Sequence, residues 1–134
     1  MTQEPFRPLS QYEKAVIERL FEVDFPGREE LRDQMLHAEA SLIEDTGDNY
    51  GSINVRTASD RKAVVQDRVP VIGITKDEAG GHVEILLHVI EGKMAELEFV
   101  RMDGAPMIGL PRLDIIQLHV RGANEDEKNI RLQE

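Results

Sequence analysis

The stretch GHVEILLHVIEGKMAELEFVRMDG, from Gly81 to Gly104, decides the fold because polar and apolar residues alternate on both sides of a short segment with a glycine. In its first half, every second residue from Val83 to Val89 is apolar, and in its second half the same holds from Ala95 to Phe99. A period of two is typical of strands that turn one face to a core. The pattern therefore predicts a β-hairpin.

The register of this hairpin, that is, which residues of the two strands pair, is fixed if both apolar sets face the same core. The shortest loop that obeys this condition is Glu91-Gly92-Lys93, which pairs Val89 with Ala95 and places His88 opposite Glu96. A two-residue loop would turn Glu96 toward the core and bury an unpaired carboxylate, at a cost of several kcal/mol. We therefore expect His88 and Glu96 to face each other on the side of the sheet away from the core.

The same face is expected to carry the candidate binding residues His88, Glu96, Glu98, Leu86 and Met94. Three interpretations are open: a half-solvated sheet surface with a cross-strand His–Glu pair, a surface that recognises a protein partner, or a catalytic or metal site. A zinc site needs three or four converging ligands. His88 and Glu96, with or without His82, would need a further ligand from a third strand, so we predict no catalytic residue, no metal ligand and no cofactor.

The N-terminal part of the chain has a helical pattern. Ser10 and Glu13 have the spacing of a capping box, which predicts a helix beginning there. The segment DFPG, residues 24–27, ends this helix, and Pro26-Gly27 suits the centre of a type II turn. A second helix is predicted from Arg28 to about Glu39.

Strand and turn patterns occupy the rest of the chain. We predict strands at 40–44, 50–57, 63–75 and 113–120 in addition to the hairpin, with the last of these a strand rather than a helix. This order predicts an α+β fold in which two N-terminal helices pack on a mainly antiparallel sheet of five or six strands. Residues 1–134 are expected to form a single domain, with flexible ends at 1–9 and 123–134.

Composition excludes several functions. The 134 residues contain no cysteine, which excludes disulfides, thiolate metal sites and cysteine nucleophiles. The net charge of −10 and the absence of Lys/Arg clusters longer than two residues argue against binding of nucleic acid or anionic membranes. The sequence shows neither a secretion signal nor an apolar run of the roughly 20 residues that a membrane span needs. A cytoplasmic location is therefore expected.

A family resemblance rests on two parts of the sequence: YEKAVIERLFEVDFPGREELRDQM and, downstream, ILLHVIEGKMAELEFVRMDGAPM. Its motifs are D-F-P-G at residues 24–27, L-L-H-V at 86–89, E-L-E at 96–98 and D-G at 103–104. With these motifs the chain resembles a family of small bacterial proteins of unknown function. The resemblance carries no activity, catalytic residue or cofactor, and it implies a loose association with toxin–immunity loci.

Two functional hypotheses remain. The first is a non-enzymatic protein-interaction domain, of immunity or adaptor type, whose acidic surface steers it to a basic protein partner. The alternative is a ligand-binding or small enzymatic domain with a pocket between helix and curved sheet, and with His88 and Glu96 at its mouth. A cavity lined by convergent polar groups would favour the alternative, and a flat, acidic, partly apolar sheet face would favour the interaction domain. The oligomeric state does not follow from the sequence.

Overall fold

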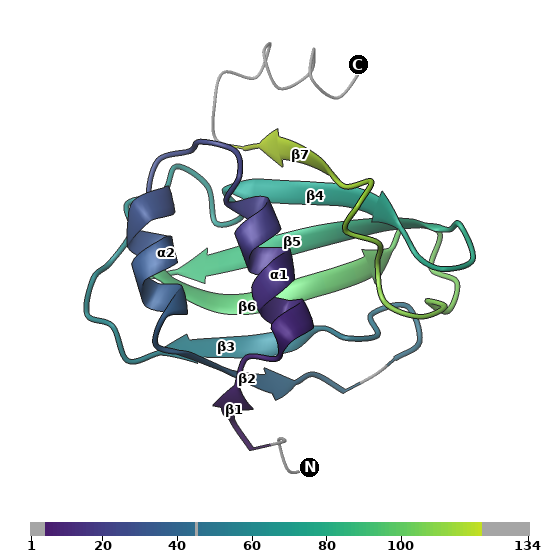
Figure 1. Ribbon diagram of the computed structural model, residues 1–134, viewed down its shortest axis with the longest axis horizontal. Coiled ribbons are helices and arrows are strands. Elements are labelled where there is room, and N and C mark those ends of the chain that lie inside the picture. Colours follow the sequence, from purple (N-terminus) through teal and green to yellow (C-terminus); the bar gives the residue numbers. More distant parts are fainter. Residues whose placement is uncertain (1–4, 45, 122–134) are drawn as a thin grey trace.

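A computed structural model describes residues 5–44 and 46–121 of the chain (Figure 1). Its elements are, in order, β1 (Arg7–Pro8), α1 (Gln11–Leu20), α2 (Arg28–Met35), β2 (Ala38–Leu42), β3 (Ile53–Thr57), β4 (Val71–Lys76), β5 (His82–Ile90), β6 (Lys93–Arg101) and β7 (Gln117–Val120). The strands form one sheet in the order β1-β2-β3-β6-β5-β4-β7, with every neighbouring pair antiparallel. Neither helix is long and apolar enough to cross a membrane in this described part of the chain.

The predicted α+β class with an antiparallel sheet is confirmed, whereas the sheet has seven strands rather than five or six. The additional strand is β1, which consists of only two residues and pairs Arg7 with Ala40. A two-residue strand has no period that a sequence pattern can reveal. β1 lies within the end that was expected to be flexible, and residues 123–134 lie outside the described part, so the flexibility of both ends stays a prediction.

The first helix begins as predicted. The Ser10 hydroxyl accepts a hydrogen bond from the Glu13 amide at 3.1 Å, and the Glu13 carboxylate accepts one from the Ser10 amide at 2.8 Å. Glu13 is also paired with Arg7, whose guanidinium nitrogen lies 2.7 Å from Oε1. The capping box therefore fixes the start of α1 and joins it to β1.

The link between the helices contains the predicted turn. Gly27 has a φ of 93° after Pro26, and the Arg28 amide donates to the Phe25 carbonyl at 3.2 Å, as a type II turn requires. The second helix is shorter than predicted and ends at Met35 rather than near Glu39. One of its last carbonyls is used by β3: the Thr57 hydroxyl donates to the carbonyl of Gln34 at 2.9 Å. Residues 38–42, the first of which were predicted to be helical, instead form β2 and pair with β3.

The prediction of a long strand over residues 63–75 is wrong, because only β4 from Val71 onward pairs in the sheet. The preceding loop runs past the β5–β6 turn instead. The Ala63 amide donates to the Gly92 carbonyl at 2.8 Å, and the Val89 amide donates to the Arg68 carbonyl at 2.7 Å. These tertiary bonds satisfy backbone groups that the sequence pattern assigned to a strand. The last strand is likewise shorter than the predicted 113–120.

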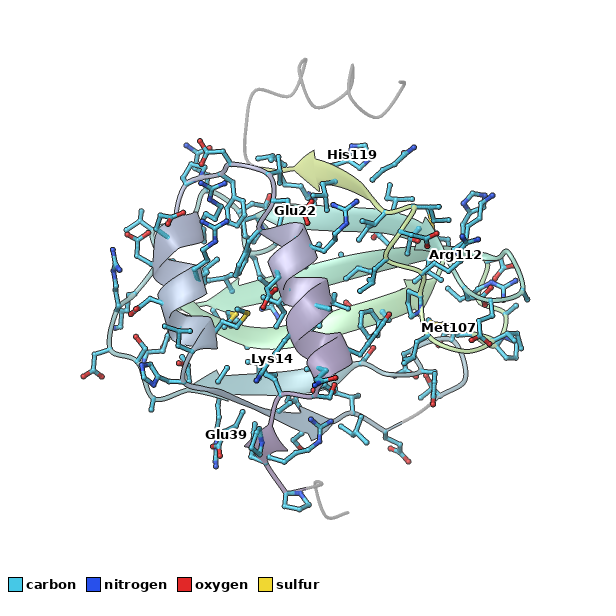
Figure 2. All side chains as sticks on the ribbon, viewed as in Figure 1. Lys14, Glu22, Glu39, Met107, Arg112 and His119 are labelled. Carbon is cyan, nitrogen blue, oxygen red and sulfur yellow. The ribbon has the colours of Figure 1, made fainter. Side chains whose placement is uncertain are left out.

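The two faces of the sheet differ in what covers them. Both helices lie on one side, here called the helix face (Figure 1). The loop that joins β6 to β7 also lies on this side, and Figure 2 labels Met107 and Arg112 in it. A hydrogen bond connects this loop to α1, because the Tyr12 hydroxyl donates to the Pro111 carbonyl at 2.6 Å. The buried core on the helix face is mostly aliphatic and includes Val16, Ile17, Leu20, Phe21, Leu31, Ile53, Val71, Val83, Ile85, Leu87, Leu97 and Phe99.

The opposite side, here called the outer face, carries the alternate side chains of the central strands. Neither helix lies on it, and these side chains are half-buried rather than buried. The outer face comprises Ile72 and Ile74 from β4, Glu84, Leu86 and His88 from β5, and Glu96, Glu98 and Val100 from β6.

Candidate functional site

The outer face brings His88 and two glutamates together. β5 and β6 pair His88 with Glu96 and Leu86 with Glu98, which confirms the predicted register at these positions. His88 Nε2 lies 2.8 Å from Glu98 Oε1, so the histidine contacts the diagonal glutamate as well as facing Glu96. One ligand atom from each of the three residues lies within 4.8 Å of the other two. This group is here called the His88 cluster.

Arg68, from the loop before β4, completes the surroundings of His88. Its Nε donates to His88 Nδ1 at 3.1 Å, so Nδ1 carries a lone pair. In a neutral imidazole the proton is then on Nε2, which donates to Glu98. The result is a directed chain of hydrogen bonds from Arg68 through His88 to Glu98. The sequence did not indicate Arg68 as a site residue, because residues 63–75 were predicted to form a strand and Arg68 lies in a loop instead.

The other carboxylates of the outer face have no cationic partner within residues 5–44 and 46–121. Among the described residues, no hydrogen bond or ion pair is formed by the side chains of Glu84 or Glu96, although both residues are half-buried. Glu84 faces Ile74 on one side and Val100 on the other. Half-buried carboxylates beside apolar side chains are desolvated in part without compensation. The outer face can therefore gain from a cation placed over it.

Apolar side chains separate these charges. Leu86 lies between Glu98 and Ile72 across the strands, and all three are half-buried. Val100 and Ile74 continue the pattern on either side of Glu84. The surface is thus a mixture of acidic and aliphatic groups on a rigid antiparallel frame.

One predicted binding residue, Met94, lies on the other side of the sheet. Met94 is 2% exposed and belongs to the core, because the register shifts after His88 and pairs Val89 with Met94 rather than with Ala95. The predicted three-residue loop is therefore wrong: the turn contains only Glu91 and Gly92, with φ of 52° and 81°. Positive φ at both central positions is typical of a type I′ hairpin turn.

A β-bulge reconciles this short turn with the outward position of Glu96. Ala95 is the extra residue of β6 and has no paired residue on β5. The two-residue turn alone would point the Glu96 side chain toward the core, and the extra residue returns it to the outer face. Gln34, buried in α2, stabilises the bulge: its Oε1 accepts from the Met94 amide at 3.0 Å, and its Nε2 donates to the Gly92 carbonyl at 2.7 Å. The contact spans about 60 positions of sequence, so no local pattern predicts it.

A second carboxylate–cation contact has a structural role. Asp77 follows β4 and is fully buried, and its carboxylate accepts from the amides of Ala79, Gly81 and Ile108 and from Arg101 Nη1 at 2.9 Å. Burial raises its pKa, but the backbone amides and the Arg101 charge outweigh burial and hold the pKa below its usual value. With four partners, this carboxylate has no free position for a ligand.

Several hollows mark the surface of the described residues, and one of about 700 Å³ is lined by residues that include Ile74, His82 and Arg101. An open groove of about 860 Å³ separates α1 from α2 and is lined mainly by charged residues, of which Arg32 and Glu29 form an ion pair with each other. A smaller pocket of about 240 Å³ is lined by Ser10, Tyr12, Glu13, Leu42, Ile43, Tyr50, Gly51 and Leu110. His88 and Glu96 do not line any of these three hollows, and their position at the mouth of a pocket between helix and sheet stays a prediction.

Comparison with known protein families identifies a family that matches most of the chain. The model of a family described as a domain of unknown function, DUF6984, matches residues 6–111, which is most of the chain. The chain belongs to the DUF6984 family. Searches of curated proteins and of solved structures found no match.

The DUF6984 match runs from β1 to the loop after β6, so it includes the whole His88 cluster and Arg68. β7, which closes one edge of the sheet beside β4, lies beyond the matched residues. The outer face around His88 is therefore built by the DUF6984 part of the chain, and the family description assigns it no activity.

Proposed function

We propose that this protein is a non-enzymatic cytoplasmic interaction domain, of immunity or adaptor type, whose outer face binds a basic protein partner. The observation that carries the proposal is a sheet face, opposite both helices, on which half-buried glutamates lie among aliphatic side chains and two of them have no ion-pair partner among the described residues. The immunity type rests on the family resemblance in the sequence. The mode of binding rests on the residues of the face.

The apolar part of the outer face supplies contact area. Ile72, Leu86 and Ile74 form a connected group on β4 and β5. Apolar area rimmed by polar groups marks surfaces that bind other proteins, and the tightest contacts lie where such groups are fully desolvated. A partner seated here would bury side chains that are now only half-buried.

The charge of the face selects the partner. Glu84 and Glu96 lack ion-pair partners among the described residues, and the whole chain carries a net charge of −10. A lysine or arginine from another protein would supply the missing cation, and the acidic field would accelerate its approach. A basic partner therefore complements the face in both charge and position.

The shape of the hollows favours binding of a protein over small-molecule chemistry. The pocket beside Tyr12, at about 240 Å³, lies below the roughly 300–1,000 Å³ of most small-molecule sites, whereas the hollows of about 490, 700 and 860 Å³ are open at the surface. The groove between the helices is open and lined mainly by charged residues. The enzymatic or ligand-binding alternative is thus supported less well than the interaction function.

The experiment compares capture by tagged wild-type protein and by the double variant Glu84→Lys/Glu96→Lys. We expect the wild type to retain a basic protein and the double variant to lose it. The control is Glu18→Lys/Glu22→Lys, which makes the same charge change on exposed residues of the helix side. Retention by the control and loss by the outer-face variant would support the proposal. Equal loss in both variants, or a retained protein that is acidic, would contradict it.

The salt dependence of association provides a second measurement. The Debye length falls from about 10 Å at 0.1 M to about 3 Å at 1 M salt, so the association rate of a steered basic partner should fall steeply over this range. Stopped-flow or surface-based kinetics with the purified partner measures it. A rate indifferent to salt would remove electrostatic steering from the proposal.

A further inference from the structure

We infer that His88, Glu96 and Glu98 form a binding site for a divalent transition-metal ion, with Zn²⁺ as the representative ion. The site lies within the outer face, but its test needs only the purified protein and metal. It can therefore fail without affecting the proposed partner, and the partner can fail without affecting it.

The geometry suits three ligands on one ion. One donor atom from each residue lies within 4.8 Å of the other two, and tetrahedral ligands at Zn–N and Zn–O distances of about 2.0–2.1 Å stand about 3.4 Å apart. His88 Nε2 and Glu98 Oε1, now 2.8 Å apart, would separate by a small side-chain rotation. The cluster comes from adjacent, hydrogen-bonded strands, so its backbone is already in place.

The donor set selects the class of ion. One imidazole nitrogen with two carboxylates suits Zn²⁺, Co²⁺, Fe²⁺ or Mn²⁺, whereas Mg²⁺ and Ca²⁺ prefer sets of oxygen ligands only. Three protein ligands on a half-exposed face leave further positions of the ion open to water or to a group from a partner. Sequence reasoning sought the missing ligand on a third strand, whereas Glu98 supplies it from β6 itself, two residues from Glu96.

Arg68 gives the site a distinctive property. In the metal-free protein Arg68 donates to His88 Nδ1, and the ring proton sits on Nε2 between His88 and Glu98. A metal ion on Nε2 replaces that proton: the proton passes to solvent, Nδ1 takes up another from solvent, and the ring stays neutral. Nδ1–H can no longer accept from Arg68, so the guanidinium must leave. Arg68 is exposed and free to do so, and its presence opposes the ion in both charge and hydrogen bonding.

The test is a calorimetric titration of tag-free, chelator-treated protein with Zn²⁺, with Mg²⁺ as the hard-ion comparison. We expect one site per chain that prefers Zn²⁺. Glu98→Gln and Glu96→Gln each raise the Kd by about tenfold or more, since loss of a direct ligand costs at least as much as loss of an outer-shell partner. Glu84→Gln, the same change elsewhere on the outer face, leaves the Kd unchanged. Arg68→Met lowers the Kd by about two- to fivefold, the range for an exposed charge contact.

The opposite signs of the Glu98 and Arg68 variants separate a built site from general attraction to acidic protein. Nitrogen-15 NMR of His88 adds a direct readout, because the proton should move from Nε2 to Nδ1 on addition of Zn²⁺. Circular dichroism checks the fold of each variant, and Glu96→Gln serves if Glu98→Gln does not fold. Equal weakening in Glu84→Gln, affinity for Mg²⁺ equal to that for Zn²⁺, or a His88 ring unchanged by Zn²⁺ would overturn the inference.

Discussion

The two faces of the sheet are built from the same strands and differ in almost every physical respect. On β5, Leu87 is completely buried under the helices, while its neighbour Leu86 is half-buried on the outer face. The helix face buries an aliphatic core, whereas the outer face keeps glutamates and a histidine among its aliphatic groups. Stability is therefore concentrated on one face, which leaves the other free to vary its chemistry without unfolding the domain.

Adjacent leucines give the largest expected contrast between the faces. Leu87→Ala removes a fully buried side chain and should lower the free energy of unfolding by about 2–5 kcal/mol, because a cavity remains in the core. Leu86→Ala deletes the same atoms on the outer face and should cost clearly less, since water already reaches that side chain. Urea denaturation of both variants measures the difference. Equal losses would mean that the outer face is covered in solution.

A smaller loss is expected from the polar contact that shapes the hairpin. Gln34→Leu keeps the volume but leaves the Met94 amide without its acceptor, and an unsatisfied buried group costs about 1–3 kcal/mol. Gln66→Leu, an exposed glutamine in the loop before β4, is the matched control and should change stability by less than about 0.5 kcal/mol.

Gln34 also connects the core to the outer face. If its contact with Met94 holds the bulge at Ala95, Gln34→Leu should disturb backbone NMR shifts across residues 93–96 and weaken Zn²⁺ binding at Glu96. Shifts confined to α2 would show that the bulge is stable by itself.

Period-two alternation predicted the faces of β5, and of β6 from Glu96 onward, correctly because side chains in a strand alternate wherever no bulge interrupts it. It placed His88 opposite Glu96, and the capping box fixed the start of α1 with equal success. Both signals are local. They depend on residues within one strand pair or within one turn of helix.

The failures concern contacts between distant segments. The turn at Glu91-Gly92 was predicted one residue too long because the compensating bulge depends on Gln34. The second helix ended early because β3 takes one of its last carbonyls, and Arg68 was assigned to a strand although its loop bonds to Val89. Sequence reasoning therefore found His88, Glu96, Glu98 and Leu86 on the outer face, misplaced Met94 and missed Arg68.

Acid should lower the stability of the fold by protonating two carboxylates of the helix side. Asp77 and Glu13 are buried, which raises the pKa of each, but their hydrogen bonds and arginine partners outweigh burial and leave both pKa values below the ordinary 3.8 and 4.5. A depressed folded-state pKa contributes stability that is present above the ordinary value and is lost as the pH falls through the folded value. Stability measured by urea denaturation should therefore fall below about pH 4.5, the ordinary value for Glu13.

Asp77→Asn tests this assignment, because it removes the titrating group while keeping its shape. The variant should be less stable than the wild type at neutral pH and should lose less stability on acidification, so the two profiles should converge at low pH. Parallel profiles would show that other carboxylates cause the acid sensitivity.

The smallest stability effect is expected at His88, where the outer face is most specialised. His88→Ala removes a cross-strand contact from a half-exposed position, and such pairs contribute about 0.2–1 kcal/mol to stability. If the outer face binds a partner through this residue, the same change should weaken binding by about 2 kcal/mol or more, as a hot spot does. A loss of stability as large as that of Leu87→Ala would make His88 part of the structural core. A small loss of stability without any loss of partner or Zn²⁺ binding would leave the Arg68–His88–Glu98 chain as a surface contact, and the two faces would then differ in burial but not in function.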